Sequence, residues 1–127
     1  MLNTINVEFH GKRLTDFHLK RIARADAQSF KEPITAYLSD VFISSSSAIG
    51  VVFGHKKRDE HGRFADGHLV RTSEICIARK EGRFWVLTTM NSRYVVASFK
   101  RGYGRASLKT FLRAIQGRYI FTPPVLQ

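Results

Sequence analysis

The residues best suited to chemistry are the lysines and arginines in the C-terminal third of the chain. Residues 82–127 hold eight of the 21 Lys and Arg and none of the ten Asp and Glu, in a chain whose net charge is +11. Guanidinium groups bind phosphate oxygens as forked donors, and ammonium groups bind them as mobile point charges. A cationic surface without neighbouring carboxylates repels itself in the free protein, and this favours an anionic partner.

One expected helix carries part of this charge on a single face. Ser107 is placed to cap its N-terminus and Gly117 to end it. Lys109, Arg113 and Gln116 follow one another at i, i+4 and i+7 and therefore share a face. The opposite face is an apolar stripe that predicts burial against the rest of the protein, formed by Leu108, Phe111, Leu112 and Ile115.

The loop before this helix adds further cations and one tyrosine. Glycines flank Tyr103 and make the loop flexible, so that Tyr103 could stack on a nucleobase. We therefore expect a small basic protein whose C-terminal surface engages nucleic acid, RNA or DNA, or a nucleoprotein complex. The expected contact residues are Lys100, Arg101, Tyr103, Arg105, Lys109, Arg113 and Arg118. The alternative for the same residues is an ordinary solvated surface that keeps the protein in solution.

A second group of candidate residues lies in the segment 55–68. It combines histidines with acids, namely His55, His61, His68, Asp59, Glu60 and Asp66. A nuclease that used general acid–base catalysis would need such groups within hydrogen-bonding distance of one another. No pair has the spacing of a metal-ligand motif such as H-E-x-x-H. We expect an exposed loop with solvated histidines, with a metal-dependent nuclease as the alternative.

No other pattern in the sequence indicates catalysis. Cys76 is flanked by Ile75 and Ile77 in an expected strand, where its thiol would be buried and inert. The chain has no glycine-rich phosphate loop, no G-x-S-x-G motif and no dinucleotide-binding fingerprint. We therefore expect a non-enzymatic protein that needs no cofactor and no metal.

The N-terminal part is expected to contribute a strand and a helical pair. Alternating apolar residues predict a short strand at residues 5–9. Thr15 predicts the N-cap of a helix over residues 16–29, with Phe17 on its apolar side. Apolar residues with helical spacing predict a second helix over residues 34–42.

Strands are expected through most of the remaining chain. Residues 44–47 predict a loop, and Gly50 indicates a bulge in the strand that follows it. Short turns near Gly82 and at residues 91–92 require antiparallel neighbours. The expected strands cover residues 48–53, 69–78, 84–90, 93–99 and, at an edge of the sheet, 119–121.

The fold class expected from these elements is α+β, in a single domain over residues 1–127. An antiparallel sheet, arranged as a meander or a small barrel, would pack against the N-terminal helical pair and the C-terminal amphipathic helix. One cysteine cannot form an intrachain disulfide, and the chain has neither an apolar stretch of about 18 residues nor a signal peptide. We expect a cytoplasmic protein without a membrane partner.

Two segments resemble a known class of proteins. The sequence GHLVRTSEI at residues 67–75 and VLTTMNSRYVV at residues 86–96 pair a V-R-T-S strand with a T-x-N-S-x-Y strand. This pairing resembles small β-rich accessory proteins of bacteriophages and other mobile elements. The resemblance implies a phage- or plasmid-encoded protein in the cytoplasm of a bacterial host, in a class that includes nucleic-acid-binding regulators, anti-CRISPR proteins and other anti-defence inhibitors.

The resemblance also implies an alternative function, that of an inhibitor that binds a host protein complex directly and blocks it. Inhibitors that mimic nucleic acid are acidic, whereas this chain has a net charge of +11. Mimicry of nucleic acid is therefore disfavoured. Capture of RNA, of DNA or of an acidic protein face stays open as an alternative.

Overall fold

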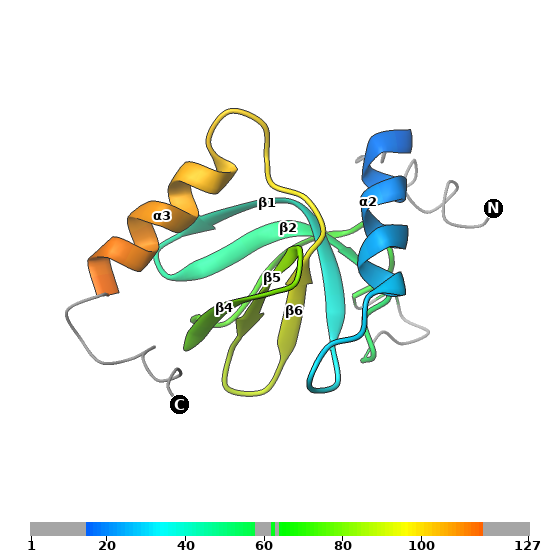
Figure 1. Ribbon diagram of the computed structural model, residues 1–127, viewed down its shortest axis with the longest axis horizontal. Helices are drawn as coiled ribbons and strands as arrows, with labels where there is room; N and C mark the ends of the chain where they lie inside the picture. Colours follow the sequence, from blue (N-terminus) through cyan, green and yellow to red (C-terminus); the bar gives the residue numbers. More distant parts are fainter. Residues whose placement is uncertain (1–14, 58–61, 63, 116–127) are drawn as a thin grey trace.

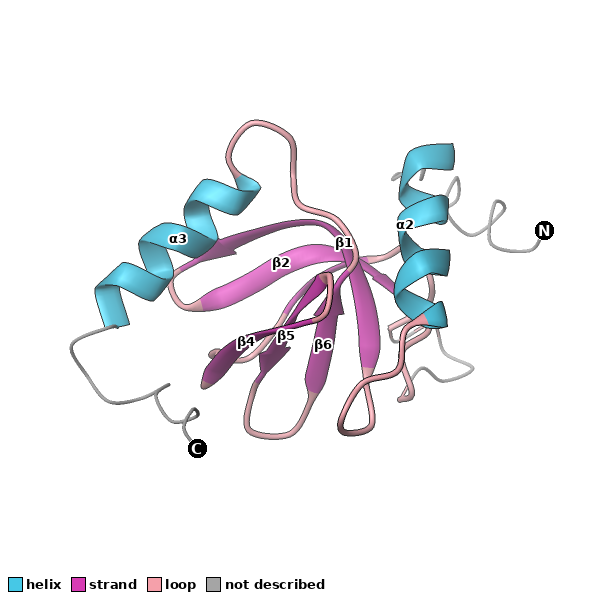
Figure 2. Cartoon of the chain, viewed as in Figure 1, coloured by secondary structure: helices cyan, strands magenta, loops and turns pink. Residues whose placement is uncertain are grey.

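Among the residues that the computed structural model describes, six strands form one mixed sheet and two helices pack against it (Figure 1, Figure 2). The structure describes residues 15–57, 62 and 64–115 of the chain, so the strands expected at residues 5–9 and 119–121 lie outside the described residues. The expected α+β class is confirmed. In chain order the elements are α2 (Asp16–Ala27), β1 (Ala36–Ser44), β2 (Ser47–Phe53), β3 (Leu69–Arg71), β4 (Ile77–Glu81), β5 (Phe84–Thr88), β6 (Arg93–Val96) and α3 (Gly104–Ile115).

Helix α2 begins at a capping box. The Thr15 hydroxyl accepts a hydrogen bond from the backbone N–H of His18 at 3.3 Å, and Nδ1 of His18 accepts one from the backbone N–H of Thr15 at 3.2 Å. Histidine thus occupies the position that Glu or Gln usually has in this motif. The expected N-cap is confirmed, and the helix ends at Ala27, slightly before its expected end.

Residues 34–42, expected to form a second helix, instead lead into and form much of strand β1. The strand contains a β-bulge at Asp40, whose φ is 59°. The bulge inserts one residue into the strand alternation, so the buried Leu38 and Val41 join the same core cluster although they are three positions apart. This spacing imitates the period of a helix. The expected helical pair is therefore wrong: in the described part of the chain, the element that follows α2 is strand β1.

The bulge of β1 lies opposite Gly50 of β2. The register of the two strands shifts between Ser39 and Phe42, the stretch that faces this glycine. A Cβ on Gly50 would lie 2.9 Å from Cγ2 of Val41 and 3.0 Å from the backbone oxygen of Ser39. The irregularity expected at Gly50 is thus in the partner strand, and the glycine makes room for it.

The strand order is β3-β2-β1-β6-β5-β4. Strands β1 and β6 run parallel, with Leu38 opposite Val96, whereas the other pairs of strands in the described sheet are antiparallel. The expectation of a purely antiparallel sheet is wrong at this seam. The parallel pair joins two antiparallel units, β1–β2–β3 and β4–β5–β6, side by side.

Strands β3 and β4 replace the single strand expected at residues 69–78, and they lie at opposite edges of the sheet. Six strands in a flat sheet would span about 24 Å, whereas the chain between β3 and β4 reaches at most about 22 Å, so the sheet curves. In this connection the N–H of Ile75 donates to the oxygen of Ser46 at 2.8 Å, and the N–H of Cys76 donates to that of Thr88 at 2.7 Å. Cys76 is partly exposed here, not buried in a strand as expected.

The turns agree in part with expectation. The loop expected at residues 44–47 is a tight turn in which Ser45 and Ser46 have φ values of 51° and 69°, as a two-residue hairpin turn requires. Strands β5 and β6 are antiparallel neighbours, as expected. Their link is longer than the predicted turn: it covers residues 89–92, and the N–H of Thr89 donates to the oxygen of Ser92 at 2.9 Å.

The two helices cover opposite faces of the sheet. Tyr94 and Val96 of β6 belong to the core cluster under α3, whereas Val95 between them belongs to the cluster under α2. Burial on both faces explains why the central strands are nearly continuous apolar runs. The expected C-terminal core stripe is confirmed, with α3 contributing Leu108, Phe111 and Ile115 and α2 contributing Ile22 and Ala25 to the other side.

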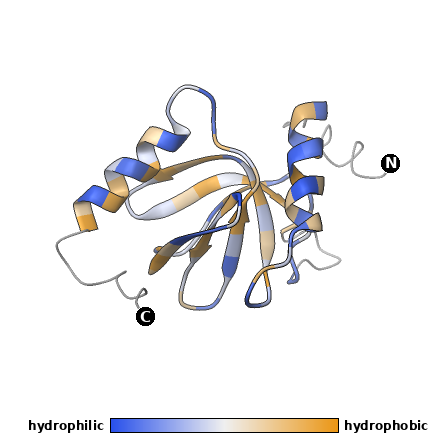
Figure 3. Cartoon of the chain, in the orientation of Figure 1, coloured by the Kyte–Doolittle hydropathy of each residue, from blue (hydrophilic) through white to orange (hydrophobic). Residues whose placement is uncertain are grey.

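Helix α3 begins at Gly104, one turn before Ser107, so Ser107 is not its cap as expected. The Ser107 hydroxyl donates to the oxygen of Gly104 at 2.7 Å and accepts from the N–H of Ile43 at 2.8 Å, which fixes the helix to β1. Hydrophilic and hydrophobic positions alternate along α3 (Figure 3). Gly117, expected to end the helix, lies outside the described residues. Within the described chain, neither helix has the length and apolar composition of one that crosses a membrane.

Candidate functional site

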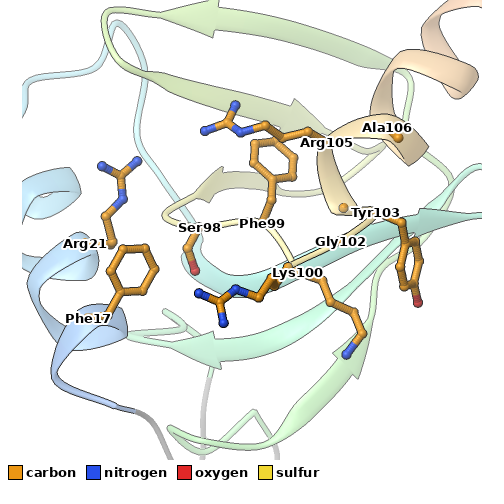
Figure 4. Close-up of a pocket in the computed structure, with 11 residues that line it drawn as sticks. Phe17, Arg21, Ser98, Phe99, Lys100, Gly102, Tyr103, Arg105 and Ala106 are labelled. Carbon is orange, nitrogen blue, oxygen red and sulfur yellow. The ribbon is translucent and has the colours of Figure 1, made fainter.

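An open groove of about 460 Å³ lies between the first turns of α2 and the loop that leads into α3 (Figure 4). Helix α2 contributes Phe17 and Arg21, and the remaining lining comes from the continuous segment 98–106. We call this site the cationic groove. It brings together two parts of the chain that are about 80 positions apart in the sequence.

The floor of the cationic groove is fixed to strand β1. The N–H of Val41 donates to the oxygen of Ser98 at 3.1 Å, and the N–H of Lys100 donates to the oxygen of Val41 at 2.9 Å. Asp40, in the bulge, donates its N–H to the Ser98 hydroxyl at 3.0 Å. These bonds extend the β1–β6 pairing beyond the end of β6, so the groove has a rigid base.

Close packing at Gly104 completes the loop. A Cβ at this position would collide with the backbone oxygen of Val41 and would lie 2.9 Å from Cβ of Phe99. The N–H of Gly104 donates to the oxygen of Lys100 at 2.9 Å, which closes the turn. Only glycine allows the start of α3 to approach the sheet this closely.

Arg21 is the cation on the α2 side of the cationic groove. Its Nε donates to the backbone oxygen of Ala97 at 3.0 Å, and its guanidinium lies 5.2 Å from the centroid of the Phe84 ring. The pKa of Arg21 is lowered from its usual value, mainly by burial and then by the positive charges of Arg24, Arg105 and Arg83, in that order. Positive charge therefore accumulates at this end of the protein, where a bound anion would relieve the repulsion.

The opposite side carries Arg105. Its guanidinium lies 4.7 Å from the centroid of the Phe99 ring, in a cation–π contact. Arg101 is exposed and Lys100 is partly exposed. Across the described residues, no Asp or Glu forms an ion pair with any of the four cations of the groove. Their hydrogen-bonding capacity is therefore largely free for a ligand.

Two aromatic rings lie at the margins of the cationic groove. The Phe17 side chain is 59% exposed and the Tyr103 side chain 46%. Phe17, expected on the buried side of its helix, thus faces solvent instead. Tyr103 packs against Phe42, with ring centroids 5.4 Å apart, and Figure 4 shows it directed away from Phe17. Of the two rings, Phe17 is the one placed beside the arginines.

A second hollow adjoins the cationic groove. It shares Phe17, Phe99 and Arg101 with the groove and adds His18 and Asp40. Nε2 of His18 lies 3.9 Å from Oδ1 of Asp40, and Nδ1 of His18 is used in the capping box of α2. Nδ1 of this histidine therefore has a structural task, and its Nε2 lies near the Asp40 carboxylate beside the groove.

The predicted contact residues divide into three groups in the structure. Those in the cationic groove are Lys100, Arg101, Tyr103 and Arg105. Lys109 and Arg113 are exposed on α3, outside the lining of the groove but on the same helix as Arg105. Arg118 lies outside the described residues, as does Gln116. Phe17 and Arg21 were not predicted as contacts, because only the tertiary fold brings α2 to this loop.

The histidine-rich segment has a different setting. His55 is 2% exposed and stacks on Phe64, with ring centroids 4.0 Å apart, while its Nδ1 accepts a hydrogen bond from the N–H of Lys57 at 3.0 Å. It is not the solvated loop histidine that was expected. Oδ1 of Asp66 accepts from the N–H of Gly54 at 2.7 Å and so holds the loop together.

Within the described residues no three metal-ligating side chains gather in one place. Asp59, Glu60 and His61 lie outside the described residues. Comparisons with protein-family models, with curated proteins and with solved structures gave no match.

Proposed function

We propose that this protein is a non-enzymatic binding protein that engages nucleic acid, free or within a nucleoprotein complex, through the cationic groove and the outer face of α3. The observation that supports this most strongly is the convergence of four cations on one concave surface without carboxylate partners among the described residues. These cations are Arg21, Lys100, Arg101 and Arg105.

Phosphate is the anion that suits this arrangement best. Three of the four cations are arginines, whose planar donors match phosphate oxygens in a fork. The positive end of the α3 dipole adds to the attraction, because Gly104, Arg105 and Ala106 of its first turn line the groove. A polyanion that enters the groove replaces repulsion between arginines with attraction to each of them.

The exposed face of α3 continues the cationic surface beyond the groove. Arg105, Lys109 and Arg113 are spaced at i, i+4 and i+8, so they form one exposed row along the helix, with about 6 Å of rise between neighbours. The buried stripe faces the sheet on the other side of the helix. Successive phosphates of one strand could therefore contact the groove and then this row.

The salt dependence of binding tests the proposal. If a nucleic acid contacts the six cations of the groove and the row, the log–log slope of affinity against salt should be about −5 for duplex DNA and about −4 for a single strand. Fluorescence anisotropy with labelled oligonucleotides between 50 and 200 mM salt measures it. A slope near zero would contradict the proposal.

Matched charge reversals test the location. The double variant Arg101→Glu/Arg105→Glu should lower affinity at least about tenfold. The control is Arg79→Glu/Lys80→Glu, which makes the same change in net charge at exposed positions of the edge strand β4. Equal loss in both variants would show a general effect of net charge and would overturn the assignment to the groove. A host protein retained at full affinity after nuclease treatment, with no nucleic-acid binding, would favour the inhibitor function instead.

A further inference from the structure

Resting on the proposed function, we infer that the cationic groove selects single-stranded nucleic acid, with one unpaired base on the ring of Phe17 and the adjoining phosphates on Arg21, Arg101 and Arg105. The proposed function requires only phosphates. The inference adds a base contact, and this contact decides which form of nucleic acid binds.

The position of Phe17 is the first reason. A single exposed apolar side chain on a protein surface needs no explanation. Phe17, however, is 59% exposed at the wall of a groove, one turn of α2 before Arg21. An exposed ring beside phosphate-binding cations is the arrangement by which proteins hold single strands, since every base offers a face for stacking.

The opposite wall supplies a second flat surface. The guanidinium plane of Arg105 is held over the Phe99 ring at 4.7 Å. Figure 4 shows Phe17 and Arg21 on one side of the groove and Phe99 and Arg105 on the other. Bases stack on arginine planes as well as on aromatic rings. A base that enters the groove therefore meets a ring on one side and a supported guanidinium on the other.

The size and rigidity of the groove disfavour a duplex. Its volume of about 460 Å³ is that of a pocket for a small ligand. A base inside a duplex has both faces covered by its neighbours and cannot lie on Phe17 without leaving the stack. The floor is hydrogen-bonded to β1 through Ser98 and Lys100 and does not need to rearrange for the ligand. A duplex would contact only the rim and the row on α3.

The experiment compares fluorescein-labelled oligo(dT) and oligo(U) 12-mers with a duplex of the same length. The duplex carries twice as many phosphates, so electrostatics alone predicts that it binds at least as well as either single strand. We expect one or both single strands to bind at least about tenfold more tightly than the duplex. A difference between oligo(dT) and oligo(U) reflects the 2′-hydroxyl and the thymine methyl group together, and either preference supports the inference.

Variants of α2 locate the base contact. Phe17→Ala should weaken single-strand binding by about 5- to 100-fold and duplex binding by less than about twofold. Phe17→Trp should keep the wild-type affinity for single strands, because a larger aromatic ring also stacks on a base. Leu19→Ala is the matched control, since Leu19 is an exposed apolar side chain on the same helix and does not line the groove.

The outcomes separate the two proposals. Equal binding of single strand and duplex, with a full salt slope and no effect of Phe17→Ala, would overturn the inference and leave the proposed function intact. Absence of binding to all three oligonucleotides would overturn both. Because Phe17 is exposed, its replacement should leave the fold unchanged, and an unchanged thermal midpoint checks this.

Discussion

The guanidinium of Arg105 lies 4.7 Å from the centroid of the Phe99 ring, and no carboxylate among the described residues pairs with it. Here an aromatic ring orients it, so its position is fixed while its charge stays uncompensated. The same contact makes Arg105 both a phosphate ligand and a flat surface in the proposed site.

Substitution of Arg105 should separate these two properties. Arg105→Ala removes one phosphate contact, so the salt slope for a single strand should decrease by about 0.7 and affinity should fall several-fold. Arg105→Lys keeps the charge but loses the plane, so the slope should stay unchanged while affinity decreases. Anisotropy titrations at several salt concentrations measure both quantities. Wild-type affinity and slope in Arg105→Lys would show that the plane has no role.

Replacement of Gly104 should connect stability with binding. In Gly104→Ala the new methyl group collides with the backbone oxygen of Val41, so we expect a loss of about 1–3 kcal/mol in the free energy of unfolding. The loop should also shift away from β1 and weaken nucleic-acid binding. Urea denaturation and anisotropy on the same samples test this. Ala23→Ser, at an exposed position of α2 outside the lining of the groove, serves as the control and should change neither quantity.

Ionisation of Tyr37 on strand β1 should lower the free energy of unfolding at alkaline pH. The hydroxyl of Tyr37 donates to Oδ1 of Asp26 at 2.9 Å. Burial, followed by this hydrogen bond and the charge of Asp26, raises the pKa of Tyr37 to about 12 from its usual value of 10. The native state thus keeps a proton that the unfolded state releases. The contribution of Tyr37 to stability is complete below pH 10 and is lost as the pH rises to about 12.

Urea denaturation at pH 9 and at pH 11 measures this effect. The wild-type protein should lose more stability between these two values than Tyr37→Phe, which cannot ionise. Equal losses in both proteins would show that other groups dominate the alkaline transition.

An ion pair at the end of the β5–β6 hairpin should be structural and independent of binding. Arg93 lies 3.3 Å from Oε2 of Glu81, and it also donates to the Thr88 hydroxyl at 3.1 Å. Both charged side chains are largely buried, so Glu81→Gln should cost about 1–3 kcal/mol of stability. Nucleic-acid affinity should not change. Glu74→Gln, at an exposed position, is the matched control, and chemical denaturation is the measurement.

Local signals predicted the helices at the two ends of the described chain. The capping residue Thr15 and the apolar stripe from Leu108 onward act over a few positions, and the structure has α2 and α3 there. The same local reasoning failed at β1, because the bulge at Asp40 gives a strand the apolar spacing of a helix. The bulge depends on the partner strand, where Gly50 leaves room for it. A pattern within one segment contains no information about its partner strand.

Long-range pairing also limited what could be predicted of the candidate site. Three cations of the groove are close in sequence, namely Lys100, Arg101 and Arg105. The distribution of charge along the chain was therefore enough to predict that they share one surface. Phe17 and Arg21 belong to the groove only because two helices on opposite faces of the sheet meet the same loop at one end of it. No periodic pattern in the sequence indicates that α2 lies beside this loop.

The parallel seam between β1 and β6 has a consequence for the order of folding. The units β1–β2–β3 and β4–β5–β6 are each continuous in the chain and antiparallel, so each can nucleate through local contacts. The seam needs both units in place, and the groove floor at Ser98 is an extension of that seam. An unfolded chain therefore has its full positive charge but no groove. The selective recognition that we propose can begin only when the two halves have joined.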